Sequence, residues 1–161
     1  MTLLGQGYNP HPKGRDAGVN CSKWRFVDEQ VEYDSHAAYE VRLVNRLGKA
    51  IPINRFLGTD EKGILSIGMT TGMEKRRRKL FSGLRGNNVH SEAHLLFLLT
   101  EYSRLQTRHR ERQYQLRFLP LGSRAQAKKT ESRLIKDYVK RYGEVPPLNS
   151  AIPNRNDDST W

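Results

Sequence analysis

A chain of 161 residues with a net charge of +11 and a single cysteine is long enough for one domain with a modest core. One cysteine excludes a disulfide framework and a CxxC metal site. The longest apolar run is only LLFLL at 95–99, which excludes a membrane-spanning helix. The positive charge favours a polyanionic partner, with nucleic acid as the first expectation and an anionic membrane as the second.

The N-terminal residues show no basic segment followed by a long apolar stretch, so we expect no secretory signal. The expected location is therefore the cytoplasm, of a bacterium or of a phage-infected host cell. Residues 1–35 begin with a stretch rich in Gly, Pro and Asn, and we expect an arm that is irregular in part. The folded domain is expected over 36–150 and a polar tail over 151–161.

The first half of the expected domain carries two strands. The stretch YEVRLV (39–44) places apolar side chains on one face at a period of two, which predicts a strand. Residues 45–62 contain two glycines and a proline and predict a long loop with room for a short strand. A second strand is expected over 64–68. Because the two strands are close in sequence, we expect them to pair antiparallel.

Three helices and a third strand complete the prediction. Helices are expected over 72–82 and 91–108, the second with an apolar face. A third strand is expected over 114–122, and a capping box and a following glycine bound a third helix over 124–142. The expected fold is therefore α/β of the α+β type, with a small three-stranded, mainly antiparallel sheet flanked by helices.

Charged residues fall at the buried sides of two predicted helices. Arg78 points away from the apolar side of the first helix, whereas Arg76 and Arg77 flank or join it. Glu131 shares the apolar face of the third helix. A charge in such a place is costly unless it is paired or binds a metal. A structural Glu–Arg pair and a functional site both stay open at this point, as do a core role and a site role for Tyr39.

Two stretches join a tyrosine and an arginine in a recognisable order. AAYEVRL contains Tyr39, and ILSIGMTTGMEKR contains Ile67 and Gly68, followed eight residues after the glycine by Arg76. Together they resemble the GIY-YIG nuclease superfamily. In that family a first strand ends in G-I-Y, a second carries Y-I-G, and an arginine follows on the first helix.

A third stretch, KKTESRLIKDYVKRYGEVPPLN, resembles the family segment that carries a metal-binding glutamate and, after it, an asparagine. Glu131 and Asn149 are the corresponding residues. The resemblance covers roughly 36–150. It implies an endonuclease that hydrolyses DNA phosphodiester bonds with one divalent ion, Mg²⁺ or Mn²⁺, bound by Glu131.

The resemblance also implies roles for the site residues. Arg76 would stabilise the charge that develops on the phosphate, and Glu131 would hold the cation. Tyr39 could serve as the base for the attacking water if neighbouring cations lower its pKa from about 10. Ser66 is included in the catalytic set because it stands at the second tyrosine's position. Some relatives use a histidine after the arginine as an auxiliary group, which makes His90 a candidate, with helix capping or solvent exposure as the favoured alternative.

Three positions depart from the family's pattern. Ser66 replaces the second tyrosine and Met69 replaces a common lysine, which removes two groups expected near the attacking water. Arg77 stands where an apolar residue usually follows the arginine, so either it or Arg76 could face the site. These departures motivate a second reading, in which the same fold is catalytically inactive and binds nucleic acid or a protein partner.

Other basic residues are expected to contact the nucleic-acid backbone, although a solvated surface is the alternative. They lie on the first helix and in the run 104–117: Arg77, Arg78, Lys79, Arg104, Arg108 and Arg112, together with Asn149. DNA is the expected partner. RNA is less favoured because the chain lacks the aromatic motif of an RRM and the GXXG loop of a KH domain.

Overall fold

The structure is a computed structural model that describes residues 20–87, 91–102 and 110–151. The elements, in chain order, are β1 (Arg25–Phe26), β2 (Ala37–Leu43), β3 (Ile53–Arg55), β4 (Gly58–Asp60), β5 (Ile64–Thr70), α1 (Met73–Leu84), α2 (Ser91–Tyr102), the 3-10 helix η1 (Arg110–Gln113), β6 (Tyr114–Pro120) and α3 (Arg124–Tyr142). This is a mixed α+β fold, as the sequence predicts. In the described part of the chain, no helix combines the length and the apolar composition needed to cross a bilayer.

The main sheet has four antiparallel strands in the order β1-β6-β2-β5. The three predicted strands are β2, β5 and β6. The prediction of a three-stranded sheet was wrong by one strand, because β1 lies within the residues expected to form an arm. Two residues are too few to show a period of two. The predicted loop at 45–62 likewise contains a separate hairpin, β3–β4.

The folded unit also begins earlier than the predicted boundary at residue 36. Val27 is fully buried and Val31 is nearly so, and both belong to the main core. The N–H of Ser22 donates to the C=O of Phe118 on β6 at 2.9 Å. At least the residues from Ser22 onward are therefore part of the fold.

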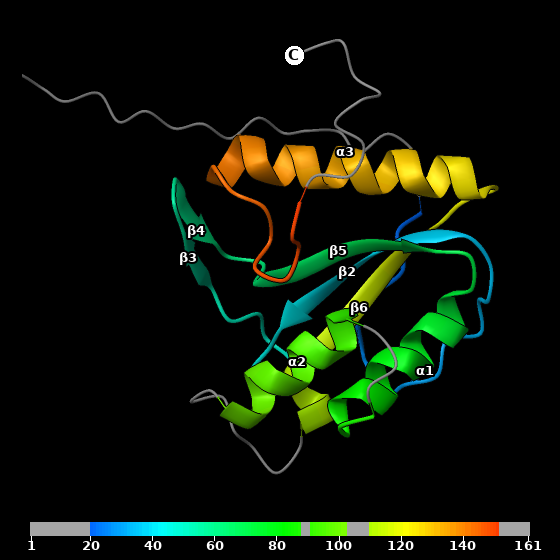
Figure 1. Cartoon of the computed structure of the whole chain (residues 1–161), viewed down its shortest axis with the longest axis horizontal. Coiled ribbons are helices and arrows are strands. Elements are labelled where there is room, and N and C mark those ends of the chain that lie inside the picture. Colours follow the sequence, from blue (N-terminus) through cyan, green and yellow to red (C-terminus); the bar gives the residue numbers. More distant parts are fainter. Residues whose placement is uncertain (1–19, 88–90, 103–109, 152–161) are drawn as a thin grey trace, which may run out of the picture.

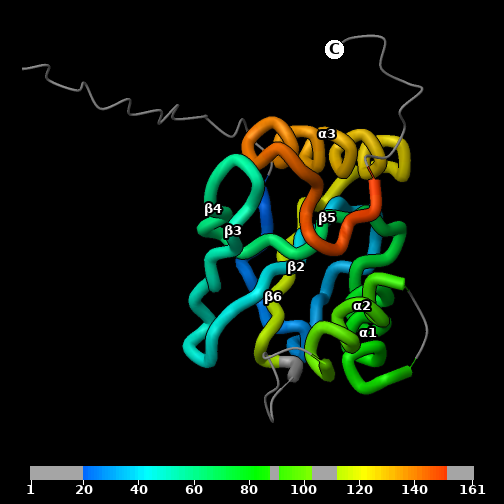
Figure 2. The backbone as a smooth tube through the Cα atoms, turned by 60° about the vertical axis from the view of Figure 1, so that its left-hand side comes forward, coloured from blue at the N-terminus to red at the C-terminus, as the bar shows by residue number. Residues whose placement is uncertain are grey.

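The sheet lies between two helical layers (Figure 1). α1 and α2 pack on one face and α3 crosses the other, an arrangement that the turned view also shows (Figure 2). Tyr39, Val41 and Leu43 of β2 belong to the main core with the buried residues of α1 and α2. Ile64 and Ile67 of β5 belong to a smaller cluster with α3.

Helices α1 and α2 approach each other closely at Gly83. A Cβ atom added at Gly83 would lie 2.2 Å from the Cβ of Ala93, in the first turn of α2. No residue larger than glycine fits there without moving one of the helices. This contact fixes the N-terminal turn of α2, and with it Glu92, relative to the rest of the layer.

The capping signals at both ends of α3 are confirmed. The Ser123 hydroxyl accepts a hydrogen bond from the N–H of Gln126 at 3.2 Å. Gly143 ends the helix with a φ of 78°, the left-handed conformation that favours glycine. These two ends determine which residues of α3 face the sheet, including Glu131.

The chain that follows α3 covers the outer edge of β5. The N–H of Leu148 donates to the C=O of Leu65 at 2.8 Å. The Asn149 carboxamide accepts from the N–H of Ile67 at 2.9 Å and donates to its C=O at 2.8 Å. Asn149 therefore pairs with β5 as a residue of a neighbouring strand would, and these groups of the strand edge are not left unpaired.

We expect Asn149→Ala to lower the free energy of unfolding by about 1–3 kcal/mol, because both backbone groups of Ile67 lose their partner in a partly buried place. Urea unfolding measures this change, and hydrogen exchange at the Ile67 amide should become faster. Asn54→Ala is the matched control, since Asn54 is exposed and accepts only from the Thr59 hydroxyl at 3.2 Å. Equal stability of the two variants would contradict the role given to Asn149.

Candidate active site

Tyr39 lies on β2, which is paired with β6 on one side and β5 on the other, and its side chain is only 2% exposed. Gly68 of β5 is directly opposite. A Cβ atom at Gly68 would lie 2.6 Å from the Tyr39 hydroxyl oxygen, so glycine is needed to leave room for the tyrosine ring. The I-G motif thus needs its glycine for a steric reason: only a residue without a side chain leaves room for the Tyr39 phenol to lie against β5.

Arg76 reaches Tyr39 from the start of α1. Its guanidinium carbon lies 5.8 Å from the centre of the Tyr39 ring. Its positive charge acts to lower the pKa of Tyr39 and of Glu131, although other effects on both groups are larger. Arg76 is therefore close to both, and of the two candidate arginines it is the one that faces the site.

Arg77 has a structural role instead. Its guanidinium donates to the Glu74 carboxylate at 2.7 and 2.8 Å and to the C=O of Val27 at 2.9 Å. Its side chain is 9% exposed, so it is not available for the nucleic-acid contact that the sequence predicts. The pair joins α1 to the segment that follows β1.

Glu131 comes to the site from α3, on the other side of the sheet edge. The backbone of Met69, at the end of β5, lies close enough to its carboxylate to act on its pKa. Burial raises the pKa of Glu131, and the charge of Glu92 adds to this, whereas the Met69 backbone N–H and the charges of Arg76 and Lys128 act to lower it. The Glu131 carboxylate is thus held beside the site in partly buried surroundings.

Glu92 is a site residue that the sequence analysis missed. It lies in the first turn of α2 and is 9% exposed. One carboxylate oxygen accepts from the Tyr39 hydroxyl at 2.6 Å, and the other accepts a short hydrogen bond from the Ser66 hydroxyl. Glu92 precedes the buried Leu96 by four residues, so the helix-face reasoning that singled out Glu131 could have found it.

The Tyr39 pKa is raised well above 10, opposite to the expected lowering. Burial is the largest cause, and the negative charge of Glu92 is the second. The charge of Arg76 opposes both but does not outweigh them. The phenol therefore keeps its proton and donates it to Glu92 in a hydrogen bond.

Three of the predicted nucleic-acid contacts keep exposed side chains: Arg78, Lys79 and Arg112. Arg112 pairs with Asp28 at 3.1 Å. The contact of these three residues with nucleic acid stays a prediction. The Asn149 side chain is hydrogen-bonded to the backbone of Ile67, which gives it a structural role. The predicted roles of His90, Arg104 and Arg108 fall outside the described residues.

The donor chemistry of the site suits a hard cation. No three His, Cys, Asp or Glu side chains converge within the part of the chain that the structure describes. Glu131 offers carboxylate oxygen, and Glu92 is near enough for its charge to affect the Glu131 pKa. Mg²⁺ is commonly bound by one or two carboxylates, with waters and phosphate oxygens as the other ligands. Glu131 fits one such ion.

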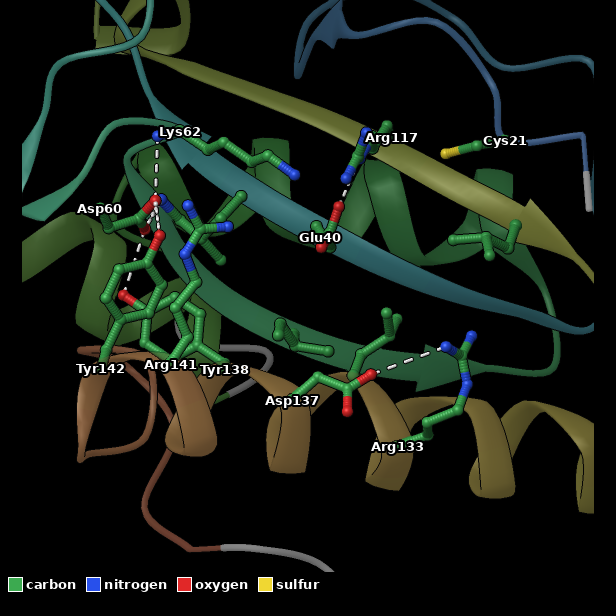
Figure 3. A pocket seen from close by; sticks show the side chains of 14 residues that line it. Cys21, Glu40, Asp60, Lys62, Arg117, Arg133, Asp137, Tyr138, Arg141 and Tyr142 are labelled. Carbon is green, nitrogen blue, oxygen red and sulfur yellow. Dashed lines mark hydrogen bonds and ion pairs between the residues drawn. The ribbon is translucent and has the colours of Figure 1, made fainter. Parts of the chain in front are cut away.

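A separate cavity of about 620 Å³ lies on the sheet face that α3 crosses (Figure 3). Polar side chains that interact with one another line it: the ion pairs Glu40–Arg117 and Arg133–Asp137, and the Asp60 carboxylate with the hydroxyls of Tyr138 and Tyr142. None of the described residues predicted for the site contributes to its lining. Of these interactions, only the hydrogen bonds to Asp60 join α3 to another element, the strand β4.

Comparison of the chain with family models, with curated protein sequences and with solved structures found no match in any of the three.

The two neighbouring arginines should respond differently to removal. Arg77→Ala should lower the free energy of unfolding by about 3 kcal/mol, because the Glu74 carboxylate loses both bonds from Arg77 and the Val27 C=O loses its side-chain donor in a nearly buried place. Arg76→Ala should lower it by about 1 kcal/mol or less. Chemical denaturation of the two variants checks this. A larger loss in Arg76→Ala would reverse the assignment of the two side chains.

Glu74 should make the fold sensitive to acid. Its hydrogen bond from Arg77 lowers its pKa, although burial opposes the shift. A carboxylate whose pKa is lower in the folded state stabilises the fold at pH values above its ordinary pKa of 4.5. This stabilisation is lost as the pH falls through the folded-state pKa. The stability difference between the wild type and Glu74→Gln should therefore be largest near neutral pH and shrink in acid. A difference independent of pH would contradict this.

Proposed function

We propose that this chain is a metal-dependent endonuclease of the GIY-YIG type, which hydrolyses phosphodiester bonds in DNA. The observation that supports it most is the meeting of Tyr39, Arg76 and Glu131, which come from β2, α1 and α3. The guanidinium of Arg76 lies 5.8 Å from the Tyr39 ring centre, and its charge acts on both of the other side chains. The sequence resemblance names the same three residues independently.

Each side chain has a task in that reaction. Arg76 would bind a non-bridging oxygen of the scissile phosphate and stabilise the negative charge that grows there. Glu131 would hold one Mg²⁺ or Mn²⁺, which supplies positive charge to the phosphate and the leaving oxygen when it is bound. The Tyr39 hydroxyl would orient the attacking water. The exposed Arg78 and Lys79 on the same helix as Arg76 would contact the backbone nearby.

The whole-chain charge of +11 supports a polyanionic substrate. The Arg76 site itself holds two carboxylates, Glu92 and Glu131. A phosphate brought against two carboxylates and one guanidinium meets more negative than positive charge. This balance supports a cation-dependent reaction over one that uses Arg76 alone.

A second candidate is an inactive module of the same fold that binds nucleic acid or a protein partner. Ser66 supports it, because the hydroxyl at the second tyrosine's position donates to Glu92. An inactive nucleic-acid-binding module would bind DNA with a steep dependence on salt concentration and leave it uncut. Affinity that hardly changes with salt would point to a protein partner.

Incubation with supercoiled, linear and branched DNA in Mg²⁺ or Mn²⁺ tests the proposal. We expect cleavage that EDTA prevents and that Glu131→Gln abolishes, because the variant loses the carboxylate for the cation. DNA affinity measured without divalent ions should survive, since the substitution removes a negative charge. Arg76→Ala should lower the single-turnover rate about 10²–10³-fold.

Asp137→Asn is the matched control for Glu131→Gln, because it removes one carboxylate charge from the exposed side of the same helix. It should cleave at the wild-type rate. Salt-sensitive binding without cleavage by the wild-type protein would favour the inactive module. Cleavage by Glu131→Gln at the wild-type rate would refute the assignment of the site.

A further inference from the structure

The carboxylate of Glu92 sits where two hydroxyl groups donate to it. Tyr39 on β2 donates to one oxygen at 2.6 Å, and Ser66 on β5 donates to the other. Arg76 from α1 and Glu131 from α3 are the charged groups close enough to interact with the same cluster. Four elements of the fold thus surround one nearly buried carboxylate.

Such a placement is costly if the residue only fills space. Burying a carboxylate away from water carries a large desolvation cost, and a second carboxylate, Glu131, lies nearby and repels it. A glutamine would accept a hydrogen bond from one hydroxyl and donate one to the other, without that charge. A carboxylate, which can accept a hydrogen bond on each oxygen and can also take up a proton, is therefore expected where a proton acceptor is needed.

We propose that Glu92 accepts the proton released in the cleavage reaction and that it acts through Tyr39. The proposal rests on the proposed nuclease function and adds to it a residue outside the sequence-predicted set. Glu92 is a positioning residue and proton acceptor behind Tyr39; it need not touch the substrate itself.

The oxygen of the attacking water forms a bond to phosphorus, and one of its O–H bonds breaks. That proton moves to the Tyr39 hydroxyl oxygen while the phenolic proton moves to the Glu92 oxygen 2.6 Å away. The bond from phosphorus to the leaving oxygen breaks, its electron pair stays on that oxygen, and solvent supplies the proton that completes the product. Glu92 then returns its proton to solvent.

The relay solves a difficulty that burial creates for Tyr39. Burial and the charge of Glu92 keep the phenol protonated, so Tyr39 cannot take a proton from water unless it gives up its own at the same time. The Glu92 oxygen is already in line to receive that proton. Ser66 engages the second oxygen and so fixes the carboxylate in this orientation.

Single-turnover cleavage by Glu92→Gln tests the proposal, because glutamine keeps a hydrogen-bond acceptor for Tyr39 but cannot accept its proton. We expect a rate loss of about 10²–10⁴-fold. DNA affinity without divalent ions should be unchanged or higher, and thermal unfolding should show a folded protein. Asp137→Asn, the exposed carboxylate on α3, should keep the wild-type rate.

Two further measurements separate proton transfer from support of the structure. Formate added to Glu92→Ala should raise the cleavage rate with its concentration, since it can occupy the space of the missing carboxylate and accept the proton. In a double-mutant cycle, Tyr39→Phe combined with Glu92→Gln should lose no more rate than the worse single variant, because the two residues act as one unit.

The outcomes also separate this proposal from the proposed function. If the wild type cleaves and Glu131→Gln does not, but Glu92→Gln keeps the wild-type rate, the nuclease assignment stands and the relay is refuted. Rate losses that add in the double variant, or a Glu92→Ala variant that formate does not restore, would also refute it. A wild-type protein that cuts no DNA with either metal would overturn both.

Discussion

The outer edge of β5 is the constraint on which the site depends. An edge strand presents peptide groups that need partners, and here the segment that follows α3 and the Glu131 side chain of α3 lie along that edge. Leu148 pairs with Leu65, and Asn149 pairs with Ile67. The Met69 N–H acts on the carboxylate of Glu131 and favours its charged form. The same ladder that closes the sheet edge thus ends in a residue of the candidate site.

This arrangement explains why the catalytic glutamate proposed here is so far along the chain from the tyrosine and the arginine. α3 crosses the face of the sheet opposite to α1 and α2 (Figure 1). Glu131 of one layer and Arg76 of the other are close enough for their charges to interact, and the backbone at the end of β5 lies beside Glu131. α3 itself is held by the apolar cluster that Ile135 forms with Ile64 and Ile67, and by the bonds of Tyr138 and Tyr142 to Asp60 at the cavity (Figure 3).

The sequence predicted those parts of the fold and site that depend on local pattern. The period of two in β2 placed Tyr39 on a buried face, and the caps of α3 set the helix that carries Glu131. It could not show strand β1, which is too short for any period, nor the hairpin β3–β4 in a stretch broken by glycine and proline. Those elements depend on pairing with distant residues, which local pattern does not contain.

The two adjacent arginines show where helix-face reasoning reaches its limit. On a helix wheel, Arg76 and Arg77 differ by only 100°, and both lie near the buried side. Burial alone would favour Arg77, yet Arg77 is buried because Glu74 and Val27 satisfy it. A satisfied arginine has fewer free donors for a phosphate. The side chain that lies beside Tyr39 is Arg76, which is the arginine proposed for catalysis.

Glu92 and Ser66 together account for the departure at the second tyrosine position. A serine is short, so in place of a phenol in the site it supplies a hydroxyl that holds a carboxylate from α2. The close contact of Gly83 with Ala93 brings that turn of α2 to the sheet. The serine hydroxyl and the buried carboxylate are therefore linked in this geometry. The linkage supports the proposed active site over the inactive module, because a nearly buried carboxylate is costly unless its charge has a use.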